Sequence, residues 1–408
     1  MEAKNRKNIL ILSLTLAVVM LGFGMVMPIF PFYIESMGAS GSELGLLVAI
    51  SPLMQLIMAP IWGSISDRHG RKPVLVVGLL GYGISMLLFG LATELWMLFV
   101  ARGVGAILSA ATMPTTMAYI SDSTSEEGRG GGMGMLGAAT GLGIVLGPAL
   151  GGWLGADSLS TPFFITAGVC LLTLLLVLLF LPESLPATAR QTAAIKIRPV
   201  AQVRELWRAL SGPLGVLLLM AFLVSFGLTC FQAIFGLYAL EKFGYGTEEV
   251  GWILTVAGVV SAVTQGALTG PLTKRWGEAA VIKVTLLASA VSFGLLLTAN
   301  TLPAILLTTG LFTLPNALLR PAVISLTSKR ADTRQGVAMG LNNSFNSLGR
   351  IAGPIWAGLA FDLNYSYPYL SGAAIMLVGF LASLVLVKQE PVPRRGAIPG
   401  AHREQQQM

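Results

Sequence analysis

The amino-acid sequence predicts an all-α membrane protein, with twelve transmembrane helices in two pseudo-symmetric six-helix bundles. Its 408 residues are 54% hydrophobic and only 11% charged, whereas charged residues make up about 25% of a soluble domain. Each transmembrane helix needs about 20 apolar residues. Twelve such helices would leave short loops and one longer connection, with no room for a separate soluble catalytic domain.

Apolar runs divide the chain into six expected spans, a polar break and six more spans. The first set is expected at residues 9–34, 44–65, 73–92, 95–120, 133–156 and 162–182. The second set is expected at residues 213–240, 249–272, 280–299, 302–327, 336–361 and 367–388. We therefore expect an N-terminal bundle over residues 1–182, a cytoplasmic linker over 183–212, a C-terminal bundle over 213–390 and a cytoplasmic tail over 391–408.

Basic residues set the expected orientation. Three of the 26 Lys and Arg residues, Arg102, Arg320 and Arg350, fall inside expected spans. If the N-terminus is cytoplasmic, Lys242 is the only basic residue on the outer side. The positive-inside rule therefore places both termini in the cytoplasm. The same bias accounts for the pI of about 9.5, and so no nucleic-acid partner is expected.

An internal repeat supports two similar halves. Sliding the second half onto the first by about 206 residues superposes many glycines and prolines, among them Gly63 on Gly270, Pro148 on Pro354 and Gly152 on Gly358. Two bundles of six helices in the same orientation are related by an axis along the membrane normal, with the substrate site between them. The repeat therefore predicts a transporter that works by alternating access.

A motif between the second and third spans carries a family resemblance. It consists of Gly63, Asp67, Arg68, Gly70, Arg71 and Lys72. This pattern, G-x-x-x-D-R-x-G-R-K, resembles the signature of the major facilitator superfamily. Asp67 can sit against the positive end of another helix or pair with Arg, so the motif is interpreted as a cytoplasmic latch. Lys274 and Glu278 stand at the corresponding positions of the second half, and only the first copy keeps the full latch chemistry.

A second motif narrows the resemblance. The fifth span contains Gly134, Gly143, Gly147, Pro148, Gly151 and Gly152. The pattern, G-x8-G-x3-G-P-x2-G-G, resembles the antiporter signature of the twelve-span drug:H+ antiporter branch. Such glycines give a smooth helix against which a neighbour can pack closely, and Pro148 removes one backbone hydrogen bond.

This resemblance implies a secondary active transporter that exports amphipathic small molecules in exchange for protons, as in multidrug efflux and antibiotic resistance. It implies a multi-pass protein of the bacterial inner (plasma) membrane, and we expect it to act as a monomer. The expected partners are the lipid bilayer, a small-molecule substrate and protons. No cofactor is expected.

Candidates for proton coupling come from two sources. Arg102 matches an arginine of the fourth span that the family associates with proton movement. Every acidic residue lies at a span end or in a loop, so no carboxylate is expected at the membrane midplane. The protonatable candidates are therefore Asp67 and Asp122 at the cytoplasmic ends, and Glu35 and Glu241 at the outer ends.

Polar stripes and flexible apolar side chains mark an expected substrate cavity. Intramembrane polar residues normally face a cavity or a partner, and rotatable or aromatic side chains can repack around different ligands. The candidates are Phe23, Met27, Gln55, Met58, Met113, Thr116, Phe231, Gln232, Phe235, Asn316, Arg320, Asn342, Asn346 and Arg350. Three arginines without a midplane acid also leave an alternative open: an exporter or flippase for an anionic metabolite or a lipid-like substrate.

Other classes of function find no support in the sequence. Two cysteines, both in apolar runs, and two histidines make a metal site or a disulfide framework unexpected. Residues 132–137 spell G-x-G-x-x-G, but the glycines open a membrane helix without a preceding strand, so no dinucleotide site is expected. No G-x-x-x-x-G-K-[ST] motif supports ATP-driven transport, and we expect no enzymatic activity.

Overall fold

The computed structural model describes residues 3–124, 126–190, 206–212, 214–331 and 335–387. The first half contains the helices α1 (Ala3–Glu35), α2 (Gly41–His69), α3 (Arg71–Leu91), α4 (Leu95–Ser109), α5 (Thr112–Ser123), α6 (Glu126–Asp157) and α7 (Thr161–Phe180), followed by the short η1 (Ala187–Ala189). The second half contains α9 (Gly215–Phe243), α10 (Thr247–Val263), η2 (Thr264–Leu268), α11 (Thr269–Trp276), α12 (Glu278–Thr298), α13 (Leu302–Lys329), α14 (Gln335–Leu363) and α15 (Tyr367–Leu386).

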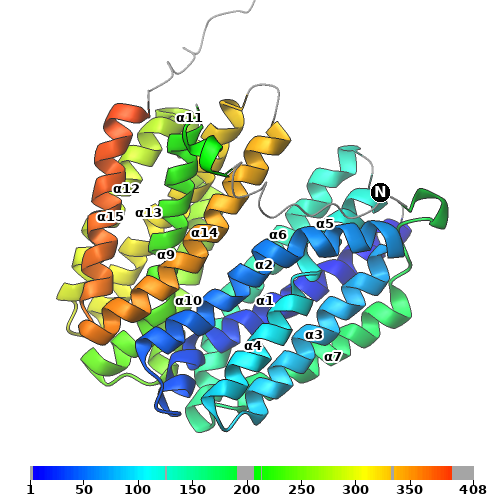
Figure 1. The fold of residues 1–408 in the computed structure, drawn as a ribbon, viewed down its shortest axis with the longest axis horizontal. Coiled ribbons are helices and arrows are strands. Elements are labelled where there is room, and N and C mark those ends of the chain that lie inside the picture. The colour runs from blue at the N-terminus through cyan, green and yellow to red at the C-terminus, as the bar shows by residue number, and fades with distance from the viewer. Residues whose placement is uncertain (1–2, 125, 191–205, 213, 332–334, 388–408) are drawn as a thin grey trace, which may run out of the picture.

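The helices form two groups that match the two halves of the sequence (Figure 1). Eleven helical segments of the described chain are long and apolar enough to cross a membrane. The remaining long helix, α14, occupies the position of the eleventh expected span but carries Asn342, Asn346 and Arg350. The all-helical membrane fold predicted from sequence is therefore confirmed. The tail at 391–408 and residues 191–205 of the linker lie outside the described residues.

Two expected spans contain irregular segments. The fourth span is split into α4 and α5 at Ala110 and Ala111. Pro114 lacks the N–H that would bond to the Ala110 carbonyl, and this missing hydrogen bond falls at the break. The eighth span contains the π-helical turn η2 between α10 and α11. Neither break was predicted from the apolar pattern.

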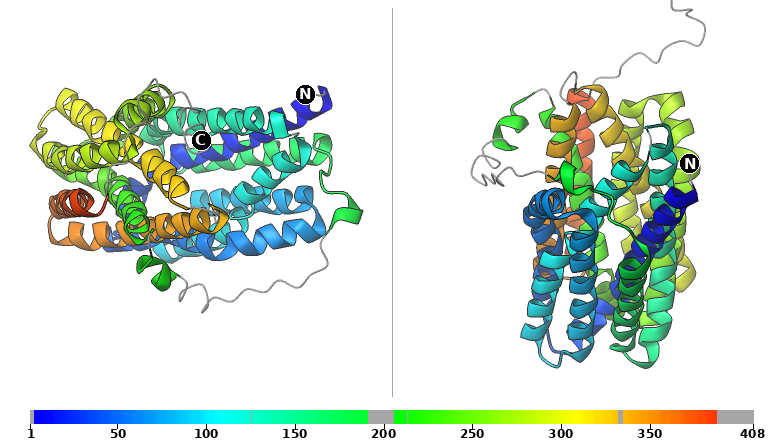
Figure 2. Two further views of the ribbon diagram at one scale, coloured as in Figure 1. Left: turned by 90° about the horizontal axis from the view of Figure 1, so that it is seen from above. Right: turned by 90° about the vertical axis from the view of Figure 1, so that its right-hand side faces the viewer.

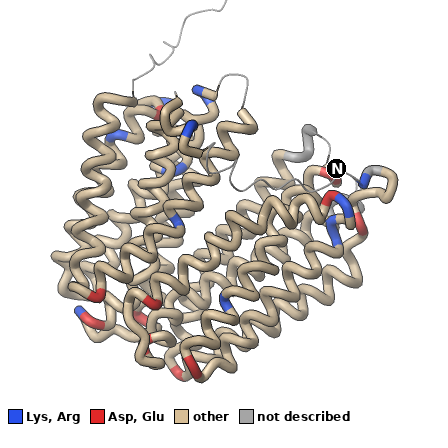
Figure 3. Tube along the Cα trace, viewed as in Figure 1, with Lys and Arg blue, Asp and Glu red and all other residues tan. Residues whose placement is uncertain are grey.

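The ends of the helices define two faces of the molecule. We call the end at which α1 begins and α15 ends the terminal face, and the other end the opposite face. The two helix groups lie together at the opposite face and diverge towards the terminal face (Figures 1 and 2). Acidic residues gather at the opposite face, and basic residues are frequent at the terminal face (Figure 3).

The two bundles contact each other mainly through the pairs α2–α14 and α6–α10. Glycines permit this close approach: a Cβ on Gly45 would collide with the Pro354 carbonyl, and one on Gly152 would lie 2.5 Å from the Thr247 oxygen. Asp362 of α14 also accepts hydrogen bonds from the backbone N–H groups of Gly41 (2.7 Å) and Ser42 (2.9 Å). A carboxylate of one bundle therefore caps the positive N-terminus of a helix in the other.

Candidate substrate cavity and helix-end clusters

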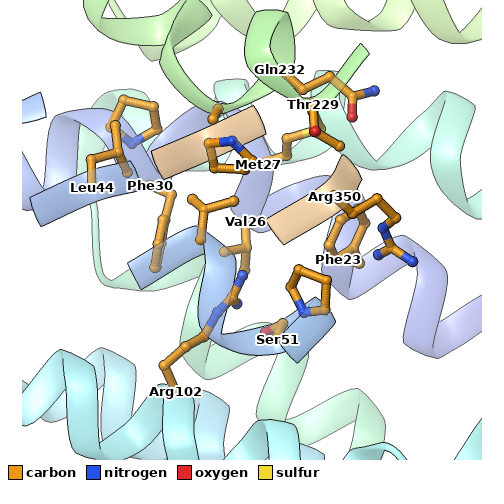
Figure 4. A pocket seen from close by; sticks show the side chains of 15 residues that line it. Phe23, Val26, Met27, Phe30, Leu44, Ser51, Arg102, Thr229, Gln232 and Arg350 are labelled. Carbon is orange, nitrogen blue, oxygen red and sulfur yellow. The ribbon is translucent and has the colours of Figure 1, made fainter. Parts of the chain in front are cut away.

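A cavity lies between the two bundles. It encloses about 740 Å³ of space, counting the part open to solvent. From α1 it is lined by Phe23, Val26, Met27, Phe30 and Pro31, from α2 by Leu44, Val48, Ser51 and Pro52, and from α4 by Arg102. The second bundle contributes Thr229, Gln232 and Ala233 from α9 and Arg350 and Pro354 from α14 (Figure 4).

Arg102 contributes an incompletely paired guanidinium to the first bundle's side of the cavity. Its carbon Cζ lies 5.1 Å from the centre of the Phe30 ring, a cation–π distance. Its buried Nε has no hydrogen-bond partner among the described residues. Figure 4 shows the side chain reaching towards Val26 and Ser51. Arg102 therefore lines the cavity with one buried N–H that has no partner among the described residues.

Arg350 supplies the second guanidinium. Its Nη1 donates a hydrogen bond of 3.1 Å to Oε1 of Gln55, which joins α14 to α2 across the bundle boundary. An arginine has five N–H donors, so Gln55 uses only one of them. Arg320 of α13 lies outside the cavity lining and is close enough to repel Arg350 electrostatically.

The structure places four of the expected cavity residues in the lining: Phe23, Met27, Gln232 and Arg350. Arg102, expected as a proton-coupling residue, lines the same cavity. Gln55 is not part of the lining, but it accepts a hydrogen bond from Arg350, which is. The other candidates lie outside its lining: Met58, Met113, Thr116, Phe231, Phe235, Asn316, Arg320, Asn342 and Asn346. A role for these in substrate binding stays a prediction.

Packing within the second bundle explains where several of these candidates lie. The ring of Phe231 lies in the apolar core, tilted against two neighbouring rings. Its centroid is 4.5 Å from that of Phe312 and 4.8 Å from that of Phe235. Asn346 accepts a hydrogen bond from Ser225 at 2.6 Å and donates one to Oδ1 of Asn342 at 2.9 Å. These amides join α9 to α14 and so stabilise the bundle. Sequence reasoning did not single out Ser51, Thr229 or Pro354 as cavity residues.

The motif at the end of α2 forms a compact ionic cluster at the terminal face. Arg71 donates to Asp67 (2.5 Å), Asp122 (2.9 Å) and Ser66 (3.1 Å). The Arg71 side chain is only 9% exposed, against 37% for Asp67 and 25% for Asp122. All these partners belong to the first bundle. In the described part of the chain, the side-chain hydrogen bonds of Arg71 stay within the first bundle, and the role of the motif as a latch between bundles stays a prediction.

Glu183, which the sequence analysis did not single out, ties the start of the linker to this cluster. Its carboxylate accepts the backbone N–H groups of Arg71 (2.8 Å) and Lys72 (3.2 Å) at the N-terminus of α3. Gly70 has a φ of +104°, and a Cβ there would lie 2.8 Å from the carboxyl carbon of Glu183. Glycine is therefore required by both backbone conformation and space.

The second bundle carries the corresponding cluster with inverted charges. Glu278, the counterpart of Arg71, pairs with Lys329 at 2.5 Å and accepts a hydrogen bond from Ser325 at 2.9 Å. Lys329 stands at the position related to Asp122 by the internal repeat. The repeat thus preserves an ion pair while exchanging its signs.

The antiporter motif lies along two helix contacts. Added Cβ atoms on Gly143 and Gly147 would lie 2.7 Å from the Ala17 oxygen and 2.6 Å from Gly24 Cα on α1, and one on Gly151 would collide with Met25. Gly152 instead faces Thr247 and Gly251 of α10, in the other bundle. The α6 glycines therefore serve both packing inside the first bundle and contact between bundles, whereas Gly134 faces open space.

The protonatable candidates lie at the helix ends, as expected. Asp67 and Asp122 share Arg71 at the terminal face. Glu35 and Glu241 are exposed at the opposite face. Among the fifteen described residues lining the cavity, none is acidic. No group of three or more His, Cys, Asp or Glu side chains suited to a metal ion occurs in the described part of the chain.

Two pseudo-symmetric bundles of membrane helices with a cavity between them define a membrane transporter rather than an enzyme. The sequence matches the Major Facilitator Superfamily over residues 12–246 and 217–406. The chain therefore belongs to that superfamily and is a multi-pass membrane protein, with the lipid bilayer and a small-molecule substrate as its partners.

Relatives extend this assignment. The chain is 34% identical to Multidrug resistance protein 1 of Bacillus subtilis (strain 168), over 94% of this chain and 97% of the relative. It is 32% identical to Multidrug resistance protein 2 of the same organism, over 93% and 95%. The crystal structure of the nucleoside transporter NupG superposes with a TM-score of 0.76 at 14% identity, over 95% of this chain and all of that one. The last likeness concerns the fold alone.

Proposed function

We propose that the protein is a secondary active exporter of amphipathic small molecules, driven by protons and working by alternating access. The observation that carries this proposal is the cavity between the two bundles, which combines an aromatic and aliphatic lining with a few polar groups. Such a lining suits ligands that share an apolar body and one polar end. The similarity to two multidrug resistance proteins supports the same activity.

The proposed setting is a bacterial plasma membrane, with a monomer whose terminal face is cytoplasmic. Support comes from the positive-inside rule, since acids gather at the opposite face (Figure 3). With this orientation, the described conformation is closed towards the outside, and the cavity would load from the cytoplasm or the inner leaflet. We also propose that the N-terminal bundle ends at residue 182, the linker at residue 212 and the C-terminal bundle at residue 390.

Transport in proteoliposomes tests the proposal. The purified full chain would be exposed to cationic, zwitterionic and anionic dyes, with and without an imposed pH gradient. We expect at least one dye to be moved uphill only when the gradient is present. Failure of every dye to move uphill, with downhill exchange intact, would show that protons do not drive the protein.

Carboxylate variants locate the proton carrier. Asp67, Asp122, Glu35 and Glu241 are the proposed candidates, and Arg102 is proposed to act on coupling through its charge. In the carrier, replacement by the amide should abolish uphill transport but preserve downhill exchange, because only coupling requires the proton. Unchanged uphill transport in Asp122→Asn, Glu35→Gln and their double variant would remove these two residues.

A second candidate function has a specific observation in its favour. The cavity holds two arginines, and no acid among its described lining residues balances them. This excess of positive charge suits an exporter or flippase for an anionic metabolite or a lipid-like substrate. The dye panel distinguishes the candidates by the charge of the compounds that move.

A further inference from the structure

The two arginines of the cavity lie on different bundles. Arg102 is on α4 of the first bundle, and Arg350 is on α14 of the second. Both line the cavity shown in Figure 4, which also holds the rings of Phe23 and Phe30. The cavity therefore contains one guanidinium from each bundle beside an aromatic surface.

No described residue neutralises either guanidinium. The described lining contains no carboxylate, and the polar partner of Arg350 is the uncharged Gln55. Arg102 rests on the Phe30 ring and leaves Nε unpaired. Arg320 adds further positive potential near Arg350. A guanidinium without a counter-ion is costly inside a membrane protein, so an anion that enters the cavity would be stabilised by both positive charges.

We infer that this cavity binds amphipathic compounds through an anionic oxygen group, a carboxylate, sulfonate or phosphate held by Arg102 and Arg350, with the apolar body against Phe23 and Phe30. This inference rests on the proposed function and names the substrate class of the same site. Guanidinium groups bind such anions through paired N–H donors. A cation would be repelled by both arginines, and the low dielectric of the site strengthens that repulsion.

A pair of probes with one ring system and opposite charges tests the inference. The full chain in nanodiscs of zwitterionic lipid would be titrated with 2-naphthalenesulfonate and with 2-naphthyltrimethylammonium by calorimetry. We expect the wild type to prefer the sulfonate by about tenfold or more. Equal affinity for the two probes, or preference for the cation, would overturn the inference without needing any variant.

Variants locate the anion. Arg102→Gln and Arg350→Gln should each weaken sulfonate binding by about tenfold, the effect of losing one charged hydrogen bond. Lys283→Gln, on α12 outside the cavity lining, removes one positive charge as a matched control and should leave affinity unchanged.

Arg350→Lys keeps the charge but loses the paired donors, so its affinity for the sulfonate should lie between those of the wild type and Arg350→Gln. If a glutamine variant does not fold, the lysine variants at both positions provide the comparison. Equal losses in all variants would contradict the assignment.

Two sources of the anion remain to be distinguished. Short-chain phosphatidic acid would be added as a competitor of 2-naphthalenesulfonate. If phosphatidic acid displaces the bound probe at a lower concentration than added 2-naphthalenesulfonate does, the natural anion is a lipid phosphate. If phosphatidic acid is needed at a higher concentration, the natural anion is a free aromatic anion. Either result supports the anion site. Uphill export of cationic dyes alone, insensitive to Arg102→Gln and Arg350→Gln, would refute this inference while leaving the proposed export function intact.

Discussion

At the scale of single residues, Gly70 shows how a motif glycine can be structural. Its φ of +104° and its contact with Glu183 leave no space for a Cβ. Gly70→Ala should therefore destabilise the protein by about 1–3 kcal/mol, through backbone strain and loss of the carboxylate cap on α3. Thermal unfolding in detergent measures the change.

Gly63 provides the matched control within the same motif. It lies inside α2, and an added Cβ would meet no atom within 4 Å. Gly63→Ala should leave stability unchanged or slightly higher, because alanine favours a helix. Equal destabilisation by both substitutions would show that the Glu183 contact is unimportant.

Asp67 shares Arg71 with Asp122, and its loss should affect transport more than folding. In Asp67→Asn the ion pair with Arg71 is lost, because the guanidinium then faces a neutral amide, while the bond to Asp122 remains. If this cluster closes the terminal face during the cycle, its charge contributes about 1.5 kcal/mol or more. The rate of dye export, normalised to folded protein, should then fall about tenfold.

The control for this prediction is Asp157→Asn, an exposed carboxylate at the opposite face. It should export dye at the wild-type rate. A wild-type rate in Asp67→Asn as well would exclude the latch interpretation.

At the scale of helices, most elements could be predicted because length and hydropathy suffice to place an apolar span. The exceptions have local causes. The break between α4 and α5 lies near Pro114, yet the related Pro321 lies inside the continuous helix α13. Proline alone therefore does not determine whether a helix is interrupted. The span that became α14 was placed at residues 336–361 from its apolar run, although its polar residues keep it out of the eleven segments that are long and apolar enough to cross a membrane.

Contact between α6 and α10 holds the opposite face closed, and Gly152 is central to it. A Cβ on Gly152 would lie 2.5 Å from the Thr247 oxygen and 2.9 Å from Gly251 Cα. Gly152→Ala should therefore separate the bundles at this face and shift the population away from the described conformation. Gly134→Ala on the same helix meets open space and should not shift it.

Spin labels at Glu94→Cys and Thr301→Cys would report this change. The two positions lie in related loops at the opposite face, one in each bundle. The distance between the labels should lengthen in Gly152→Ala and stay unchanged in Gly134→Ala. An unchanged distance in both would mean that α10 accommodates the methyl group without opening.

At the scale of the molecule, the residues that line the cavity were the hardest feature to predict. Phe23 and Met27 reach it, whereas Phe231 and Phe235, which look equally suitable in the sequence, pack into the core of the second bundle. Which side of a mostly apolar helix faces a cavity depends on how the bundles tilt in one conformation. Arginines were more informative, because a charge inside a membrane helix needs water or a partner.

The central claim is that transport requires the opposite face to open and close between α2 and α14. The backbone N–H of Ser42 donates a hydrogen bond of 2.9 Å to Oδ2 of Asp362 there. Cysteines at both positions, in a chain with Cys170→Ala and Cys230→Ala, should form a disulfide on oxidation that locks this face. Dye transport in proteoliposomes should stop on oxidation and return on reduction, while the Ser42→Cys single variant stays active throughout. Full transport by the cross-linked protein would contradict alternating access at this interface.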